Sequence, residues 1–281
     1  MIVVTGATGN IGRTLAPLLA EAGEEVVGVS REERHAGLPA GVRHARADVG
    51  DAASMRPVLK GADAFFLLLG GELNGHGESP QALLDAAMDA GVKRVVLLSS
   101  QLNSTRPKAL SHTRLREFEA AVHASGADFT ILRPGGFASN AFAWAESVRT
   151  RRTVFAPFAD VALPVIDPAD IAEVAAAVLR EDGHAGRTYE LTGPEAISPR
   201  RQVAVISEAL GEEVAFVELS REEAHAHMAQ FMPQEVIGGT LDVLGVPLPG
   251  EQQISTDVEK ILHRPARPFG AWVARSLPAF Q

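Results

Sequence analysis

Along the first half of the chain, short apolar runs alternate with longer segments in which apolar residues recur at helical spacing. The apolar runs predict strands at residues 2–5, 25–29, 42–46, 63–69, 93–98, 128–132 and 187–192. The helical patterns fall at residues 11–22, 53–60, 79–90, 112–125 and 168–181. Residues 65–69 are apolar at every position, which is typical of a parallel strand that is covered on both faces. The pattern therefore predicts an α/β fold with a doubly wound parallel Rossmann sheet.

The regular alternation ends at about residue 135, and prolines interrupt the last part of the chain. We expect residues 1–150 to form a dinucleotide-binding Rossmann domain, to which segments near 163–195 return. Residues 196–281 are expected to form a smaller, mainly helical lobe that binds a substrate or a partner. We expect this lobe at the carboxyl edge of the sheet, where folds of this class bind their ligands.

A group of glycines follows the first predicted strand, in the order G-x-x-G-x-x-G. At this position glycines allow a tight turn and a close approach of the backbone to a pyrophosphate. The amides and the positive end of the following helix then bind the phosphate charge. We predict a dinucleotide site formed by Gly6, Thr8, Gly9, Asn10, Ile11 and Gly12. The alternative is an ordinary glycine-rich turn between a strand and a helix.

The end of the second predicted strand indicates which dinucleotide binds. Sheets that bind NAD have an acidic residue there for the ribose, whereas this chain has Ser30 and Arg31. Arginine forms charge-assisted hydrogen bonds to a phosphate. We predict that NADP(H) is preferred over NAD(H), with Ser30 and Arg31 at the 2′-phosphate and Arg34 nearby. The alternative is that Arg31 is an ordinary surface charge beside Glu32 and Glu33.

Residues after the third and fourth predicted strands complete the adenosine side of this site. Asp48 and Val49 are placed to hold the adenine, and Leu68, Leu69 and Gly70 are expected to border the adenine ribose. An equally open alternative is that Asp48 caps the helix that follows it.

Composition narrows the range of functions. The 281-residue chain has no cysteine, which excludes disulfides and thiolate chemistry, and its net charge of −9 argues against a nucleic-acid surface. No apolar run approaches the roughly 20 residues that span a membrane, and the N-terminus has no basic signal region. We therefore expect a cytoplasmic protein with neither a membrane nor a nucleic acid as partner. We predict no metal site, because His225 and His227 would face different sides of a helix.

The motifs described above, together with further short motifs along the chain, resemble those of the NmrA-like branch of the atypical short-chain dehydrogenases/reductases. The resemblance rests on Thr5–Gly12, Arg31, 48–49, 91–100, 125–126 and 130–135, and it continues through 137–140, 167–171 and 191–195. The branch includes NADPH-dependent quinone and azo-dye reductases, and also redox sensors that bind the dinucleotide without turning it over. The resemblance implies that Ser99, Pro134, Gly135 and Phe137 also contact the cofactor.

The acid used by typical members of the wider family is missing. Those dehydrogenases use a serine after the fifth strand, with a tyrosine and a lysine four residues apart on the next helix. Here Ser111 and Leu115 stand at the tyrosine and lysine positions, and the only tyrosine of the chain is Tyr189.

Two residues are left as candidates for a catalytic role. Ser100 lies in the serine position together with Ser99, and His112 lies one position from the tyrosine site. One position on a helix is a rotation of about 100°, so His112 would point away from the tyrosine direction. The alternative for His112 is a surface histidine at the start of a helix.

We therefore expect an NADPH-dependent reductase that transfers hydride to a quinone-like or conjugated small molecule without the Tyr/Lys pair. Such an acceptor takes its protons from water, and the protein mainly positions it. The alternative is a non-catalytic sensor of the NADP+/NADPH ratio that regulates a partner protein, and a third reading is an isomerase-like relative. Apolar side chains are expected to form a lid or, alternatively, core: Phe137, Phe142, Trp144, Phe155, Phe158, Met228, Phe231 and Met232. The sequence leaves the substrate and the oligomeric state open.

Overall fold

A computed structural model describes residues 1–31, 38, 41–70 and 77–281 of the chain. The chain divides into two units, and each is described by itself. The first unit contains Met1–Asn103, His112–Pro134 and Ala169–Glu190, and the second contains Ser104–Ser111, Gly135–Pro168 and Leu191–Gln281. The first unit differs from the predicted domain 1–150, because residues 104–111 and 135–150 belong to the second unit. As a functional division, the predicted domains stay a prediction.

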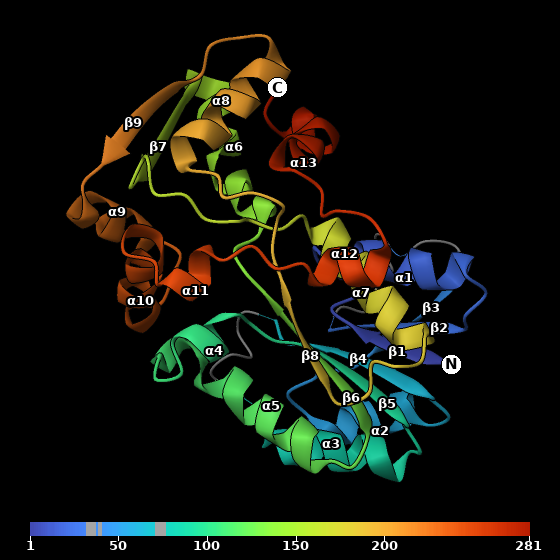
Figure 1. Cartoon of the computed structure of the whole chain (residues 1–281). Helices are drawn as coiled ribbons and strands as arrows, with labels where there is room; N and C mark the ends of the chain where they lie inside the picture. Colours follow the sequence, from blue (N-terminus) through green and yellow to red (C-terminus); the bar gives the residue numbers. More distant parts are fainter. Residues whose placement is uncertain (32–37, 39–40, 71–76) are drawn as a thin grey trace. The chain divides into compact units, whose positions relative to one another are not determined.

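The first unit is built on a seven-stranded sheet in the order β3-β2-β1-β4-β5-β6-β8 (Figure 1). Its strands are β1 (Ile2–Thr5), β2 (Val26–Ser30), β3 (Val42–Arg46), β4 (Ala64–Leu68), β5 (Arg94–Leu98), β6 (Asp128–Pro134) and β8 (Arg187–Leu191). The pairing is parallel: Val3 lies opposite Val27 on β2 and Phe65 on β4. The predicted doubly wound parallel sheet is confirmed, and each predicted strand end lies within about two residues of the observed one.

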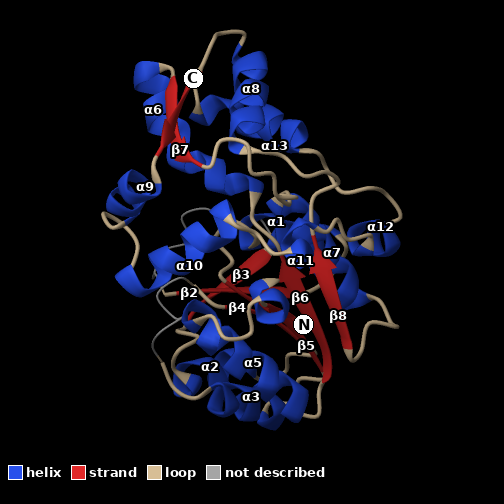
Figure 2. Cartoon of the chain, turned by 60° about the vertical axis from the view of Figure 1, so that its left-hand side comes forward, coloured by secondary structure: helices blue, strands red, loops and turns tan. Residues whose placement is uncertain are grey.

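Helices cover both faces of this sheet. They are α1 (Gly12–Glu21), α2 (Ala52–Leu59), α3 (Pro80–Asp89), α5 (Thr113–Ala124) and α7 (Pro168–Arg180). Helices α2, α3 and α5 lie on one face, and α1 and α7 lie on the other (Figures 1 and 2). Alternate strand residues such as Val3, Phe65 and Leu97 are fully buried in the core beneath α2, α3 and α5. Burial of each such side chain stabilises the fold by roughly 1.5–3 kcal/mol. This packing holds the strands in place, and with them the strand ends at which the candidate site lies.

The second unit is mainly helical, as expected, but it also contains a two-stranded parallel sheet that the sequence analysis did not predict. Strand β7 (Thr153–Pro157) pairs with β9 (Ala215–Leu219), and Val154 lies opposite Phe216. Its helices are η3 (Ala138–Trp144), α6 (Ala145–Arg151), α8 (Pro199–Leu210), α9 (Arg221–Met228), α10 (Gln234–Gly245), α11 (Pro249–Gln252), α12 (Asp257–Leu262) and α13 (Phe269–Ser276). No helix in the described part of the chain is long and apolar enough to cross a membrane.

Most of the apolar side chains expected as a lid belong to the core of the second unit. The ring of Phe142 lies 4.9 Å from that of Trp272 and stacks on Phe280 with 6.1 Å between centroids. Phe158 and Met228 pack with α9 and α10 in a separate apolar cluster. These contacts support the alternative that most of these residues are core, although Phe142 remains 43% exposed at the edge of its cluster and Phe231 is 63% exposed.

Candidate functional site

The strand order reverses between β1 and β4, and in open α/β sheets ligands bind outside the carboxyl ends of the strands at such a point. Thr5 fixes the two strand ends there. Its buried hydroxyl accepts a hydrogen bond from the amide of Leu68 at 2.8 Å and lies 3.0 Å from the carbonyl oxygen of Phe66, to which it donates. The loops that leave β1 and β4 therefore start from fixed positions.

The loop after β1 makes a turn that only glycine allows without strain. Gly6 has a φ of +63°, and its carbonyl oxygen accepts a hydrogen bond from the amide of Gly9 at 2.9 Å. A Cβ at Gly12 would lie 2.2 Å from that same oxygen and 2.5 Å from the Cα of Ala7. The absence of a side chain at Gly12 thus lets helix α1 begin directly against the loop.

The N-terminus of α1 is exposed to a ligand. Among the described residues, no side chain caps the helix at Ile11 and no acidic residue lies in its first turn. Thr8, Gly9 and Asn10 are exposed just before it. Backbone amides at a helix N-terminus attract an anion. The predicted glycine loop therefore fits the diphosphate of a dinucleotide.

The carboxyl ends of β2 and β3 lie side by side and bring basic and polar groups together. Arg31 follows β2, is exposed, and accepts a hydrogen bond at its carbonyl oxygen from Nε of Arg46 at 3.2 Å. Oγ of Ser30 lies 2.9 Å from Nε2 of His44. The sequence analysis missed His44 and Arg46, although their positions on the predicted strand 42–46 were a usable signal. Arg34 lies outside the described residues.

The loop after β3 holds Asp48 and Val49. Oδ1 of Asp48 accepts a hydrogen bond from the amide of Gly50 at 2.8 Å, and the amide of Asp48 donates to Oγ of Ser54 at 3.0 Å. Helix α2 is capped by Asp51, so the alternative that Asp48 is the cap is wrong. Val49 packs against the core of the sheet. Contact of Asp48 and Val49 with adenine stays a prediction.

The end of β4 lies directly beside the glycine loop. A Cβ at Gly6 would come within 2.9 Å of Cδ2 of Leu68, so the two segments are in close contact. Leu69 packs against the core, whereas a Cβ at Gly70 would meet no atom of the described residues within 4 Å. Contact of Leu68, Leu69 and Gly70 with the adenine ribose stays a prediction.

On the other side of the switch point, Ser99 is part of a buried hydrogen-bond network. Its hydroxyl donates to Oε1 of Glu119 at 2.5 Å and accepts from Nδ2 of Asn103 at 2.9 Å. Arg133 holds the same carboxylate through Nε at 3.0 Å and Nη2 at 2.8 Å. Because its proton is donated to Glu119, this hydroxyl is not available to donate to a ligand while the network is intact.

The carboxylate of Glu119 remains charged in this buried place. Burial raises its pKa, but the hydrogen bonds from Arg133, Ser99 and Asn103 together outweigh burial and hold the pKa below its usual 4.5. The guanidinium of Arg133 also lies 3.6 Å from the carboxylate of Glu190. The network therefore depends on a paired charge in the interior.

The two catalytic candidates have structural partners. Oγ of Ser100 accepts a hydrogen bond from the amide of Leu102 at 3.2 Å, at the start of helix α4 (Leu102–Thr105). His112 is the residue before α5, where burial, and secondly the charge of Arg116, lower its pKa below the usual 6.5. A neutral imidazole at pH 7 is a poor proton donor. Catalytic roles for Ser100 and His112 stay predictions.

Three predicted contacts with the cofactor follow along the chain. Pro134 ends β6 and is buried, and its carbonyl oxygen accepts a hydrogen bond from the amide of Gln101 at 3.0 Å. Gly135 and Phe137 belong to the second unit, where the amide of Gly135 donates to Leu191 at 2.9 Å. Their contact with the cofactor stays a prediction.

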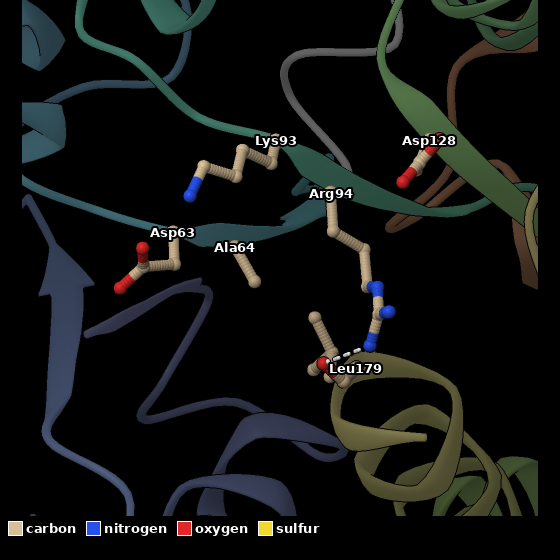
Figure 3. Close-up of a pocket in the computed structure, with 6 residues that line it drawn as sticks. All are labelled: Asp63, Ala64, Lys93, Arg94, Asp128 and Leu179. Atoms are coloured by element: carbon tan, nitrogen blue, oxygen red, sulfur yellow. Dashed lines mark hydrogen bonds between the residues drawn. The ribbon is translucent and has the colours of Figure 1, made fainter. Parts of the chain in front are cut away.

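A cavity of about 280 Å³ lies at the opposite, amino edge of the sheet (Figure 3). It is lined by Asp63, Ala64, Lys93, Arg94, Asp128 and Leu179. Arg94 donates to the carbonyl oxygen of Leu179 and to Asp182, both at 2.9 Å. Arg94 thus contacts the C-terminal end of α7, and none of the six lining residues belongs to the glycine loop. The described residues contain no group of three His, Asp or Glu side chains arranged to hold a metal ion.

Comparison with known proteins assigns the family. A family model described as NAD(P)H-binding matches residues 6–182, which include the glycine loop and strands β2 to β6. The chain belongs to this NAD(P)H-binding family. It is 36% identical over 282 residues to the (4-alkanoyl-5-oxo-2,5-dihydrofuran-3-yl)methyl phosphate reductase of Streptomyces griseus, covering 100% of this chain and 99% of the relative. It is 30% identical over 285 residues to an NAD(P)H azoreductase of Xenophilus azovorans, again covering 100% and 99%.

A solved structure that contains NADPH has a similar fold. The NADPH-dependent quinone oxidoreductase of Escherichia coli, in a crystal structure with NADPH, superposes with a TM-score of 0.83 and 26% identity, covering 98% of this chain and 99% of that one. The resemblance found in the sequence and the prediction of an NAD(P)H-binding Rossmann fold are confirmed.

Proposed function

We propose that this NAD(P)H-binding protein is an NADPH-dependent reductase of conjugated, electron-poor small molecules. One observation carries the proposal: the glycine loop at the switch point is built for a dinucleotide, whereas the serine of the usual acid site is committed to Glu119. An enzyme with this arrangement suits acceptors that need orientation and not a proton from the protein.

The residues proposed to hold the diphosphate and the 2′-phosphate lie in the first unit. The amides around Gly9 and Gly12 fit the diphosphate, and Ser30 and Arg31 are placed for the 2′-phosphate. When bound, NADPH supplies a hydride. The protein binds and orients the two reactants, and water supplies the protons that the reduced acceptor takes up.

The names of the relatives suggest the class of acceptor. The Streptomyces griseus reductase is named for an unsaturated lactone phosphate, and the other two relatives are named for azo compounds and quinones. All three classes are conjugated and electron-poor. We propose that unsaturated lactones and quinone-like compounds are the first acceptors to test, with the unsaturated lactones favoured by the 36% identity.

Preference for NADP(H) over NAD(H) is part of the proposal. It is supported by Arg31, which stands after β2 where an NAD-binding sheet has a carboxylate. A cytoplasmic location is also part of the proposal, and it is supported by the absence of cysteine from the chain.

The test is steady-state oxidation of NADPH with a panel of quinones, an azo dye and an α,β-unsaturated lactone with and without a phosphate group. We expect at least one acceptor to be reduced well above the uncatalysed rate, and more slowly with NADH. Heat-unfolded protein is the control for contaminating chemistry. No acceptor above the uncatalysed rate, with NADPH shown to bind, would reject the reductase.

The commitment of Ser99 also favours a second function, a sensor of the NADP+/NADPH ratio that regulates a partner protein. A sensor requires clearly different affinities for the two redox forms, because a ligand shifts an equilibrium only by its differential affinity. Calorimetric titration with NADP+ and NADPH separates the two functions. Equal affinities would exclude the sensor.

A further inference from the structure

Strand β3 brings a second arginine to the end of β2. Arg46 lies opposite Ser30 in the parallel register, and its Nε donates to the carbonyl oxygen of Arg31 at 3.2 Å. The guanidinium of Arg46 is thereby held at the point where the chain leaves β2. That hydrogen bond uses one of the five N–H donors of the group.

His44 precedes Arg46 by two residues and so lies on the same face of β3. Its Nε2 lies 2.9 Å from the hydroxyl oxygen of Ser30, so the two side chains share a hydrogen bond whose donor depends on the histidine tautomer. The end of β2 is therefore surrounded by two polar side chains from β3 in addition to its own Ser30 and Arg31.

We propose that Arg46 is a specificity-determining residue for the 2′-phosphate of NADP(H), and that His44 positions Ser30 for the same group. The inference rests on the proposed function, because it requires that a dinucleotide binds along this edge. The adenosine ribose of a Rossmann-bound dinucleotide lies at the end of the second strand. A phosphate dianion on that ribose is bound most strongly by guanidinium groups, which donate along fixed directions.

The same geometry predicts selectivity for NADPH over NADH. NADH has a hydroxyl in place of the 2′-phosphate, so it offers Arg46 no anion to bind. Loss of the Arg46 guanidinium is therefore expected to weaken NADPH and to leave NADH nearly unchanged. Selectivity would then depend on side chains from two strands, β2 and β3, and not on the residue after β2 alone.

The experiment measures dissociation constants by calorimetry for NADPH, NADH, 2′,5′-ADP and 5′-AMP with the whole chain and its variants. For Arg46→Gln we expect roughly 10- to 100-fold weaker binding of NADPH and 2′,5′-ADP, the range for loss of hydrogen bonds to a charged group. NADH and 5′-AMP are expected to change by less than about twofold. For Ser30→Ala and His44→Gln we expect smaller losses, about three- to tenfold, again for the phosphorylated ligands only.

Arg43→Gln is the matched control. Arg43 lies on the same strand, is exposed, and faces Glu25 at 3.5 Å, so the variant loses the same charge away from Ser30. We expect the ratio of the NADH and NADPH dissociation constants of Arg43→Gln to equal that of the unchanged protein. If Arg46→Gln does not fold, Arg46→Lys serves as the second variant. Lysine keeps the positive charge but lacks the planar guanidinium group. We expect Arg46→Lys to weaken the binding of NADPH, but not of NADH, by less than Arg46→Gln does.

Three results would overturn the assignment. They are equal weakening of NADPH and NADH by Arg46→Gln, no weakening of either, and an equal loss of selectivity in Arg43→Gln. An unchanged protein that binds NADPH and NADH equally would also reject the subsite, while leaving a reductase in place. Failure of the unchanged protein to bind any of the four ligands would instead reject the proposed function itself.

Discussion

The two halves of the carboxyl edge of the sheet use their polar groups in different ways. On the β1 side, the glycine loop and the start of α1 present backbone amides with no side-chain cap among the described residues. On the β5 and β6 side, Ser99, Asn103, Glu119 and Arg133 bind one another in the interior. The first half is arranged for a ligand, and the second is arranged for the stability of the fold.

This difference teaches how one edge can bind a redox cofactor without supplying an acid. A buried polar group contributes to stability only when its partners are present, so the Ser99–Glu119 network is rigid. The same rigidity removes the serine from chemistry. The five predictions below test whether changes on one side affect stability and changes on the other affect binding.

The largest effect is expected for Glu119→Gln. The change leaves Arg133 without its bidentate carboxylate, and breaking one partner of a buried pair costs roughly 3–5 kcal/mol of unfolding free energy. Urea denaturation at pH 7 measures the loss. Glu117→Gln is the control, because Glu117 is exposed on the same helix and, in the described part of the chain, forms its ion pair with Arg114. This variant should cost less than about 0.5 kcal/mol.

The contribution of Glu119 to the free energy of unfolding should also depend on pH. Its pKa in the folded chain is below the unfolded value of 4.5, so the carboxylate stabilises the fold above pH 4.5. That contribution is lost as the pH falls through the folded pKa. The difference in stability between the unchanged protein and Glu119→Gln should therefore narrow in acid, and a constant difference down to pH 3 would contradict the network.

Gly12→Ala should act on the other half. Its Cβ would meet the carbonyl oxygen of Gly6 at 2.2 Å, so the loop must move away from α1. A displacement of this kind at a binding loop is expected to weaken NADPH by about 100-fold. Gly238→Ala is the control, because a Cβ there meets nothing within 4 Å. Fluorescence titration with NADPH checks both variants, and unchanged affinity in Gly12→Ala would remove the loop from the site.

Ser99→Ala is expected to lower the free energy of unfolding by about 1–3 kcal/mol, because Glu119 and Asn103 each lose a hydrogen-bond partner. The turnover number with the best acceptor should change by less than about threefold. A serine that donates to the reacting carbonyl would instead lose on the order of 100-fold or more. Ser100→Ala, compared in the same assay, distinguishes the two adjacent hydroxyls.

The smallest effect is expected for His112→Gln, which should change kcat/KM by less than about twofold, since the imidazole is neutral at pH 7. Proton NMR should give His112 a pKa below 6.5, and Arg116→Gln should raise that pKa by removing a nearby positive charge. A rate that falls as the pH rises through the His112 pKa, and loses that dependence in His112→Gln, would make His112 the acid.

The sheet could be predicted because its signals are local. Continuous apolar runs mark buried parallel strands, and glycines such as Gly61 and Gly91, both with positive φ, stand where α2 and α3 stop. The pair β7 and β9 was missed because β9 is largely exposed and its partner lies some sixty residues earlier in the chain. Short strands of that kind carry little periodicity of their own.

The candidate site likewise has parts that could be predicted from the sequence and parts that could not. The glycine loop is a contiguous motif, so the sequence alone identified it. The partner of Ser99 was not predictable, because Glu119 and Arg133 reach it only through the packing of α5 on the sheet. The cap of α2 shows the limit most clearly: Asp48 and Asp51 both precede the helix, and only the backbone geometry selects Asp51.

The most direct test of the central claim is a crystal structure of the chain grown with NADPH. The account predicts diphosphate oxygens on the amides around Gly9 and Gly12, with the 2′-phosphate beside Arg31 at the end of β2. A diphosphate bound at the amino edge, near Lys93 and Arg94, or no cofactor at a saturating concentration, would contradict it.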